Sequence, residues 1–446
     1  MPRPIEAVGT STAAFVGLAP GGPADRAVLV TAAADYEAAF GAGGHLGAAV
    51  RGFFANGGQR LWVAPALELL DDQDDVAILA CPGITDPARV AAAAAWCEAR
   101  GDCFLIADVA QAGPPQAPVR SSAAAAYWPW LVVGGETVPP SGAVAGVYAR
   151  TDVWAAPAGV VRGALAGTSC VAEEVTRAQQ EQLLAARINA VRRFEGAGPV
   201  VWGARTLAPD AQDEWKYVNV RRLSAFLERS IDRGTRWAAF EPNGDPLWTE
   251  LRDSAEAFLH WLFLAGAFAG RTADEAFFVR CDSATMSQAD IDSGTVVILV
   301  GFAPSKPGEF ILLRIRIQLR RRTIADLLEA ARQRLDRVQP AEAAAALAAG
   351  ALLVDIRSEA QIDRDGRIPG AVHHPRNVLE WRVDPASGHS DPALAGALER
   401  RVIVVCEEGY QSSLAAATLQ DLGVRGATDV VGGFRAWRDA GLGVER

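Results

Sequence analysis

The residues best suited to chemistry follow an apolar run near the end of the chain. Val402 to Val405 predict a buried strand, Cys406 comes directly after it, and the residues from Gln411 to Leu419 predict a helix. A cysteine between a strand and a helix start is ringed by backbone amides, and the helix terminus stabilises its thiolate. Such a thiolate can accept a sulfane sulfur atom and hold it as a persulfide. The sequence therefore predicts Cys406 as a catalytic nucleophile.

The loop after Cys406 is the predicted substrate-binding segment. Glu407 and Glu408 are acidic, so we expect them to repel an anionic sulfur donor and to oppose formation of the thiolate. The sixth residue after Cys406 is Ser412 rather than arginine, which excludes a cysteine phosphatase. The predicted loop consists of Glu407, Glu408, Gly409, Tyr410, Gln411 and Ser412.

Other catalytic and metal-binding patterns are missing from the sequence. The six cysteines lack the paired spacing of zinc sites, and the adjacent His373 and His374 would point to opposite faces of a strand. We therefore expect no metal and no cofactor. His45 is the only histidine before residue 260 and has no nucleophile motif near it, so we expect no serine-protease triad.

A series of elements and motifs surrounds the cysteine loop. Residues 324–338 have apolar side chains at helical spacing and predict a helix that Pro340 stops. An alanine-rich helix is predicted at 341–349, and an apolar strand follows it. In order, the chain then shows D-I-R at 355–357, R-I-P-G-A at 367–371, the cysteine loop at 406–412 and G-G-F-R-A-W at 432–437.

This order of motifs resembles the rhodanese-like sulfurtransferase domain over residues 322–446. The resemblance implies an α/β domain with a parallel sheet, in which Cys406 is catalytic, Asp355 and Arg357 support the site, and a small sulfur donor or acceptor binds. Active members often carry arginine or lysine inside the loop, whereas this loop has none. A noncatalytic rhodanese fold therefore remains an alternative.

The middle of the chain predicts a second α/β region. Strands at 76–80, 103–107 and 130–133 alternate with a helix at 91–99. Alternation of this kind predicts a parallel sheet with helices on its faces.

Residues 200–319 contain several separated motifs in one order. They are WKYVNVRRL at 215–223, WAAFEPNGDPLW at 237–248, EAFFVRCD at 275–282 and PGEFILLRIRI at 307–317. These motifs resemble the C-terminal region of contractile tail sheath subunits, and the opening at 5–17 is similar to the beginning of that family.

The sheath resemblance implies a tail-sheath fold with a subtilisin-like α/β region. We expect a sheath N-terminal region at 1–65, a middle α/β region at 66–199, a C-terminal assembly region at 200–321 and the rhodanese-like domain at 322–446. It also implies two kinds of partner, other sheath subunits and an inner tail tube protein. Because Met1 stands almost directly before the matching segment, we expect most of the family's N-terminal arm to be absent.

Composition limits the remaining classes of function. The formal net charge of −10 disfavours nonspecific nucleic-acid binding, and the arginine cluster at 320–322 is too short to change that. The apolar run at 255–270 is shorter than a spanning helix, so we expect no membrane contact. Scattered cysteines and the missing signal pattern favour the cytoplasm or a phage tail or injection particle.

Two functions are compatible with these observations. The first is a structural subunit that polymerises around a tube and carries an accessory sulfur-handling domain. The alternative is a rhodanese-type sulfurtransferase that uses the sheath-like region as a scaffold. The alternating strand at 309–319 is either completed by a neighbouring chain through β-augmentation or is an ordinary strand of its own sheet.

Overall fold

The computed structural model describes residues 2–304, 309–319 and 323–446, without the side chain of Asp213. The chain forms two compact units, residues 1–320 and 321–446. The arginine cluster at 320–322 and the first two residues of the PGEFILLRIRI motif lie outside the described residues. Each unit is described by itself below.

The first unit contains an eight-stranded sheet in the order β11-β10-β6-β5-β4-β1-β3-β2. The six inner strands of this order run parallel to one another. The two edge strands, β2 and β11, pair antiparallel with their neighbours. Their bounds are β1 Ala13–Val16, β2 Val28–Val30, β3 Leu61–Ala64, β4 Ile78–Ala80, β5 Phe104–Asp108, β6 Ala124–Trp128, β10 Ile188–Phe194 and β11 Gly198–Val201.

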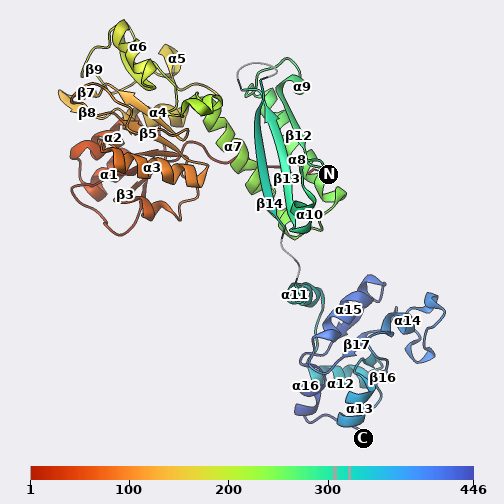
Figure 1. The fold of residues 1–446 in the computed structure, drawn as a ribbon. Coiled ribbons are helices and arrows are strands. Elements are labelled where there is room, and N and C mark those ends of the chain that lie inside the picture. The colour runs from red at the N-terminus through yellow and green to blue at the C-terminus, as the bar shows by residue number, and fades with distance from the viewer. Residues whose placement is uncertain (1, 305–308, 320–322) are drawn as a thin grey trace. The chain divides into compact units, whose positions relative to one another are not determined.

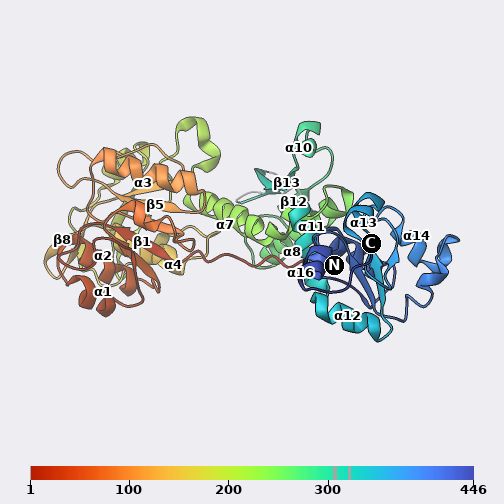
Figure 2. The same cartoon turned by 90° about the horizontal axis from the view of Figure 1, so that it is seen from below.

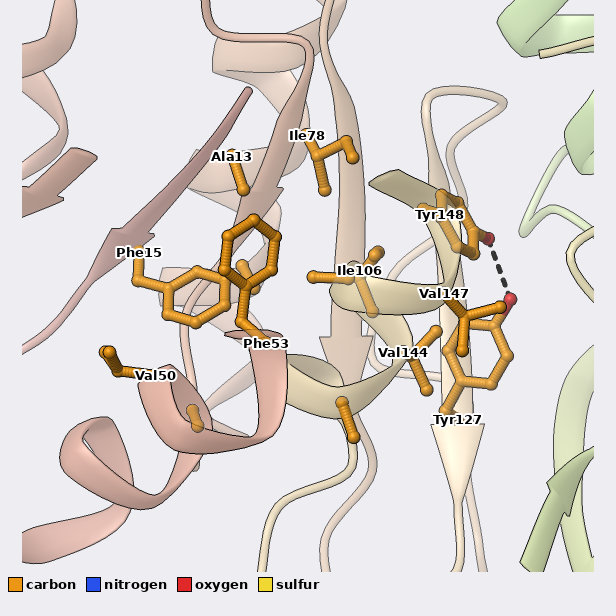
Figure 3. Close-up of a cluster of buried hydrophobic side chains, with 14 of the residues drawn as sticks. Ala13, Phe15, Val50, Phe53, Ile78, Ile106, Tyr127, Val144, Val147 and Tyr148 are labelled. Carbon is orange, nitrogen blue, oxygen red and sulfur yellow. Dashed lines mark hydrogen bonds between the residues drawn. The ribbon is translucent and has the colours of Figure 1, made fainter. Parts of the chain in front are cut away.

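Helices cover both faces of this sheet, with α3 on one side and α1, α2 and α4 on the other (Figure 2). Alternation along β1 explains the two cores, since Phe15 packs toward α2 and α4 whereas Ala14 and Val16 pack toward α3. Figure 3 shows the first core, where Tyr127 and Tyr148 share a hydrogen bond of 2.7 Å. The helices are α1 Ala33–Phe40, α2 Gly44–Ala55, α3 Pro87–Arg100, α4 Ser141–Arg150, α5 Gly159–Arg162 and α6 Arg177–Ala185.

The predicted strand at 130–133 is not part of the parallel sheet. The alanine-rich β6 takes that place, and Pro129, which has no N–H to donate, follows it directly. Residues 131–133 instead form β7 of a small antiparallel sheet with β8 Glu136–Val138 and β9 Cys170–Val171. The alanine side chains of β6 fit between the helices on the two faces of the sheet. The prediction missed this strand because it relied on larger apolar residues.

The rest of the first unit is a three-stranded antiparallel sheet packed on two long helices (Figure 1). Strand β14 lies at one edge and pairs only with β13 among the described residues. Its side chains alternate between the apolar core and solvent, as the sequence pattern predicts. The elements are α7 Val218–Gly234, α8 Asp245–Leu264, α9 Ala273–Ala276, β12 Phe277–Arg280, α10 Gln288–Asp292, β13 Thr295–Phe302 and β14 Ile311–Gln318. Within the described part of the chain, no helix combines the length and apolar character that crossing a bilayer requires.

The second unit is a parallel sheet in the order β16-β15-β17-β18 with helices on both faces. The strands are β15 Leu352–Asp355, β16 Val372–His373, β17 Val402–Val405 and β18 Ala427–Asp429. The helices are α11 Ile324–Arg334, α12 Pro340–Ala348, α13 Glu359–Asp365, α14 Leu379–Val383, α15 Gln411–Asp421 and α16 Gly433–Asp439.

The predicted helix at 324–338 is too long, because α11 ends at Arg334. Leu335 then enters the core on one face of the sheet and Val338 enters the core on the other face, which a continuous helix could not achieve. Val338 also forms a parallel bridge with Val430 beyond β18. The segment after α11 is therefore extended chain that closes the second unit.

Candidate active site

Cys406 lies at the carboxyl end of β17, and its side chain is buried, with 4% of the residue exposed. The backbone N–H groups of Gly409 and Ser412 lie 3.2 and 3.3 Å from its sulfur atom and donate to it. Two fixed donors at the start of α15 stabilise negative charge on sulfur. The loop predicted to ring the cysteine therefore has the expected form.

Glycines allow the loop to close this tightly. Gly409 has φ of +78°, and a Cβ atom there would lie 2.9 Å from the backbone nitrogen of Gly432. The G-G-F-R-A-W motif packs against the loop from the other side, where Phe434 N–H donates to the Cys406 carbonyl at 2.8 Å. Arg435 N–H donates to the Glu407 carbonyl at 3.1 Å. Backbone hydrogen bonds from α16 thus hold the loop in place.

The acidic side chains of the loop have cationic partners. Arg435 lies 3.2 Å from Glu407 and 2.5 Å from Glu408, and the buried Arg357 lies 3.9 Å from Glu407. Cationic side chains therefore offset part of the charge of the two carboxylates, and their expected repulsion of an anionic donor stays a prediction. The sequence hid the pairing because Arg435 stands 28 residues after Glu407.

Asp355 and Arg357 form a buried bidentate pair behind the loop, with the Arg357 nitrogens 2.8 to 3.1 Å from the Asp355 carboxylate. The Arg357 guanidinium also donates to the Gly366 carbonyl at 2.8 Å and lies 3.5 Å from the ring centroid of Phe434. Through Phe434 and Glu407 this pair contacts both sides of the cysteine loop. The predicted supporting role of Asp355 and Arg357 stays a prediction, and their contacts fit it.

The remaining predicted loop residues differ in exposure. Tyr410 is 54% exposed, and the guanidinium of Arg332 lies 5.3 Å from its ring centroid. Gln411 is exposed at the first turn of α15, while Ser412 is fully buried against the cysteine. Tyr410 and Gln411 are therefore accessible to solvent, whereas Ser412 is not.

A buried carboxylate that the sequence analysis missed completes the site. Asp429, at the end of β18, accepts hydrogen bonds from the hydroxyls of Ser412 at 3.1 Å and Ser413 at 2.8 Å. Arg337 binds both of its carboxylate oxygens, at 2.8 and 3.1 Å. The carboxyl ends of parallel strands meet at one edge of a sheet, so the polar residue ending β18 was the available signal.

The other cysteines lie in different surroundings. Burial raises the pKa of the Cys81 and Cys281 thiols to about 12 and also raises that of Cys97. Cys170 is partly exposed. Among the described residues, Cys406 is the cysteine whose sulfur accepts two backbone N–H groups.

The two adjacent histidines, His373 and His374, each contact a protein group through Nε2. The Nε2 atom of His373 lies 2.8 Å from the Arg357 carbonyl, and that of His374 lies 2.7 Å from an Asp391 carboxylate oxygen. The described residues contain no group of three or more side chains arranged to hold a metal ion.

The α/β region of the first unit brings a serine and an aspartate together. The Ser141 hydroxyl donates to the Asp108 carboxylate at 2.7 Å, and Gly83 N–H donates to the same group at 2.9 Å. A catalytic triad requires a histidine between serine and aspartate, whereas this aspartate binds the serine directly and the serine is fully buried. The pair fixes the start of α4 and does not form a protease site.

Three family models match the chain. They describe a phage tail sheath protein central domain at residues 66–207, a phage tail sheath C-terminal domain at 210–318 and a rhodanese-like domain at 339–440. A tail sheath protein of Vibrio phage KVP40 is 30% identical over 181 residues, which cover 40% of this chain. The chain spans only 26% of the length of that relative.

Solved structures and a curated enzyme extend the comparison. The contracted helical sheath of the anti-feeding prophage is 33% identical with a TM-score of 0.60, covering 70% of this chain and 94% of that chain. The contracted sheath of an extracellular contractile injection system, PVC, is 32% identical with a TM-score of 0.62, covering 70% and 92%. A thiosulfate sulfurtransferase, GlpE, of Pseudomonas savastanoi pv. phaseolicola is 33% identical over 102 residues, or 23% of this chain and 86% of that protein.

Proposed function

Because the chain belongs to the contractile tail sheath family and ends in a rhodanese-like domain, we propose that it is a sheath subunit that also transfers sulfur. Residues 1–65, 66–199 and 200–321 form the N-terminal, middle and assembly regions of the sheath part. This part packs with other copies around an inner tail tube, in a phage tail or a related injection particle. Residues 322–446 carry the sulfur-transfer site.

The observation that carries the chemical half of the proposal is the pair of backbone N–H groups aimed at the Cys406 sulfur. The thiolate attacks the outer sulfur of a donor such as thiosulfate, and the donor's sulfur–sulfur bond breaks. Sulfite leaves with the electrons of that bond, and Cys406 becomes a persulfide. An acceptor such as cyanide then attacks the outer sulfur, which releases thiocyanate and restores the thiolate.

A cyanide-coupled assay on the full-length protein tests this step. We expect thiosulfate-dependent thiocyanate formation that Cys406→Ser abolishes and that Cys170→Ser, a matched change in the first unit, leaves intact. Mass spectrometry after thiosulfate alone should find one added sulfur atom on the peptide that contains Cys406. Absence of both signals would mean that the domain is a noncatalytic rhodanese fold.

The observation that carries the structural half is strand β14. It is an edge strand among the described residues, and it alternates a buried apolar face with an exposed face that carries Leu312, Arg314 and Arg316. An edge strand of this kind offers backbone groups to a strand of another copy. Electron microscopy and sedimentation of the full-length protein test whether copies assemble, alone or with a tube protein.

A further inference from the structure

The carboxylate of Asp429 is fully buried directly behind the cysteine loop. Four hydrogen bonds converge on it, two from the Arg337 guanidinium and one each from the hydroxyls of Ser412 and Ser413. Both serine bonds end on the same oxygen, Oδ2. The Arg337 side chain is mostly buried and neutralises the charge of the carboxylate. The Ser413 hydroxyl has a second acceptor, the Gly409 carbonyl at 3.1 Å, so Arg337 is the fixed partner of Asp429.

Ser412 links this carboxylate to the nucleophile. Its hydroxyl oxygen lies 3.2 Å from the Cys406 sulfur and 3.1 Å from the Asp429 oxygen. A serine hydroxyl has one hydrogen and two lone pairs, so it can donate to only one of these neighbours at a time. While Ser412 donates to Asp429, it presents a lone pair to the sulfur. That arrangement accepts an S–H group and disfavours a thiolate.

Two influences on the sulfur therefore oppose each other. The backbone N–H groups of Gly409 and Ser412 favour the thiolate, and the Ser412 side chain, turned by Asp429, favours the thiol. A hydrogen bond to a carboxylate is stronger than one to a neutral group, so Asp429 competes effectively for the serine hydrogen.

We propose that Asp429, held by Arg337, is a positioning residue that keeps the Ser412 hydroxyl turned away from Cys406 and so holds the resting sulfur as a thiol. The inference rests on the proposed sulfur transfer and adds its protonation step. When the thiol proton leaves to water, the Ser412 hydroxyl turns its hydrogen to the sulfur, while Arg337 still donates to both oxygens of Asp429. The reactive thiolate then forms with three donors around it.

The charged groups around Cys406 come from several elements, and most of them are paired with one another. Glu407 and Glu408 of the loop contact Arg435 of α16, and Glu407 also faces Arg357, which binds Asp355. Arg332 of α11 donates to the Gly409 carbonyl at 3.0 Å. The groups that face the site are Asp429, Arg337, Arg332, Glu407, Glu408, Arg435, Arg357 and Asp355.

The test is the pH dependence of iodoacetamide labelling at Cys406 in the full-length protein. Ser412→Ala removes the acceptor that favours the thiol, so we expect the labelling midpoint to move to lower pH and the rate below the midpoint to rise about fivefold. Thr418→Ala is the matched control, because Thr418 lies on the same helix α15 and its hydroxyl donates to the Leu414 carbonyl at 2.9 Å. We expect Thr418→Ala to leave the midpoint unchanged and Ser412→Thr to retain the wild-type value.

In the Asp429→Asn background we expect Ser412→Ala to shift the labelling midpoint in the opposite direction. With the carboxylate gone, the Ser412 hydroxyl is free to donate to the thiolate, so the midpoint of Asp429→Asn itself falls. Adding Ser412→Ala to that variant then raises the midpoint. If Asp429→Asn does not fold, the sign for Ser412→Ala alone decides, since that change leaves no buried charge unpaired.

A rise of the midpoint in Ser412→Ala with Asp429 intact would overturn the inference, because it would mean that the serine donates to the thiolate at rest. An equal shift in the Thr418→Ala control would overturn it as well. The thiocyanate assay separates this result from the proposed function. If the wild-type protein forms no thiocyanate but the variants shift the labelling midpoint as predicted, the positioning role is supported and the sulfur transfer is contradicted. If thiocyanate forms but the midpoint shifts are reversed, the sulfur transfer is supported and the positioning role is contradicted.

Discussion

Cys406 is about as buried as Cys81, yet the two thiols have different neighbours. Burial raises the pKa of Cys81, and the nearby Asp108 raises it further, whereas two backbone N–H groups donate to the Cys406 sulfur. Reactivity toward alkylating agents follows the thiolate fraction, so hydrogen bonding rather than exposure sets Cys406 apart.

We therefore expect limiting iodoacetamide at neutral pH to label Cys406 before Cys81, Cys97 and Cys281. Peptide mass spectrometry at increasing times measures the order, and the partly exposed Cys170 reports the rate that accessibility alone gives. Faster labelling of any buried cysteine of the first unit than of Cys406 would contradict the thiolate argument.

The acidic loop leads to a prediction about the donor. Glu408 has 45% of its side chain exposed beside the cysteine loop and shares Arg435 with Glu407. Replacing Glu408 by glutamine removes one negative charge from the path of thiosulfate, and we expect kcat/KM for thiosulfate to rise a few-fold at low salt and less at high salt. Arg435→Ala should lower it.

The matched control for Glu408→Gln is Glu399→Gln, at an exposed position near the opposite end of β17. The Glu399 change alters the net charge equally and lies away from the carboxyl end of the strand. An equal gain from both variants would assign the effect to overall charge and not to the loop.

A buried carboxyl in the first unit gives a pH dependence of stability. Burial raises the pKa of Asp108 to about 6, above the ordinary value of 3.8, although hydrogen bonds from Gly83 and Ser141 lower it in part. The folded state therefore holds this proton more tightly than the unfolded state. The stabilisation is complete below about pH 4 and is lost as the pH rises through about 6, by on the order of 3 kcal/mol.

Urea unfolding at several pH values measures this loss, with labelling of the buried Cys97 and Cys103 as the signal that the first unit has unfolded. Asp108→Asn should flatten the decline between pH 4 and 6, and the exposed Asp25→Asn should not. If Asp108→Asn leaves the pH-dependent loss of stability unchanged, other carboxyl groups cause that loss.

At the scale of elements, residue pattern predicted where the cysteine loop lies but not what surrounds it. The apolar strand before Cys406 and Gly409 after it are local signals, so the position of the cysteine and its loop could be predicted from the sequence. Asp429, Arg337 and Arg435 reach the loop only through the packing of β18, the segment after α11, and α16. Their roles depend on the order of strands in the sheet, which no local pattern encodes.

The end of α11 illustrates the same limit. Leu335 and Val338 continue the helical spacing of apolar residues, so period alone predicted one helix to Val338. The two side chains enter different cores because the chain crosses the edge of the sheet there. Tertiary packing overrides the helical pattern at this point.

The segment that follows α11 should therefore contribute to the stability of the second unit, although it precedes residues 339–440, which match the rhodanese-like domain. Leu335, just after the helix, is 8% exposed in the core, and truncating it to alanine should cost about 2 to 3 kcal/mol. Leu327→Ala, at an exposed position of α11, is the control and should cost much less. Hydrogen exchange of β15 and β17 amides in urea measures both changes, and equal effects would mean that Leu335 does not stabilise the core.

At the scale of the whole molecule, each unit has its own apolar cores. The first unit buries two faces of its large sheet and a separate core under β12, β13 and β14, and the second unit buries both faces of its parallel sheet. Cys406 belongs to one unit and β14 to the other. The proposed assembly and the proposed sulfur transfer therefore depend on different residues.

The last prediction is that the two activities can be removed one at a time. Leu312 is 55% exposed on the edge strand β14, and Leu312→Asp places a charge there, which opposes pairing with a strand of another chain. We expect this variant to lose rapidly sedimenting assemblies and to keep thiocyanate formation, because its core residues are unchanged. Cys406→Ser should assemble like the wild type and form no thiocyanate. Normal assembly of Leu312→Asp would mean that β14 is not the contact between copies, and loss of assembly in Cys406→Ser would mean that the sheath part requires the sulfur site.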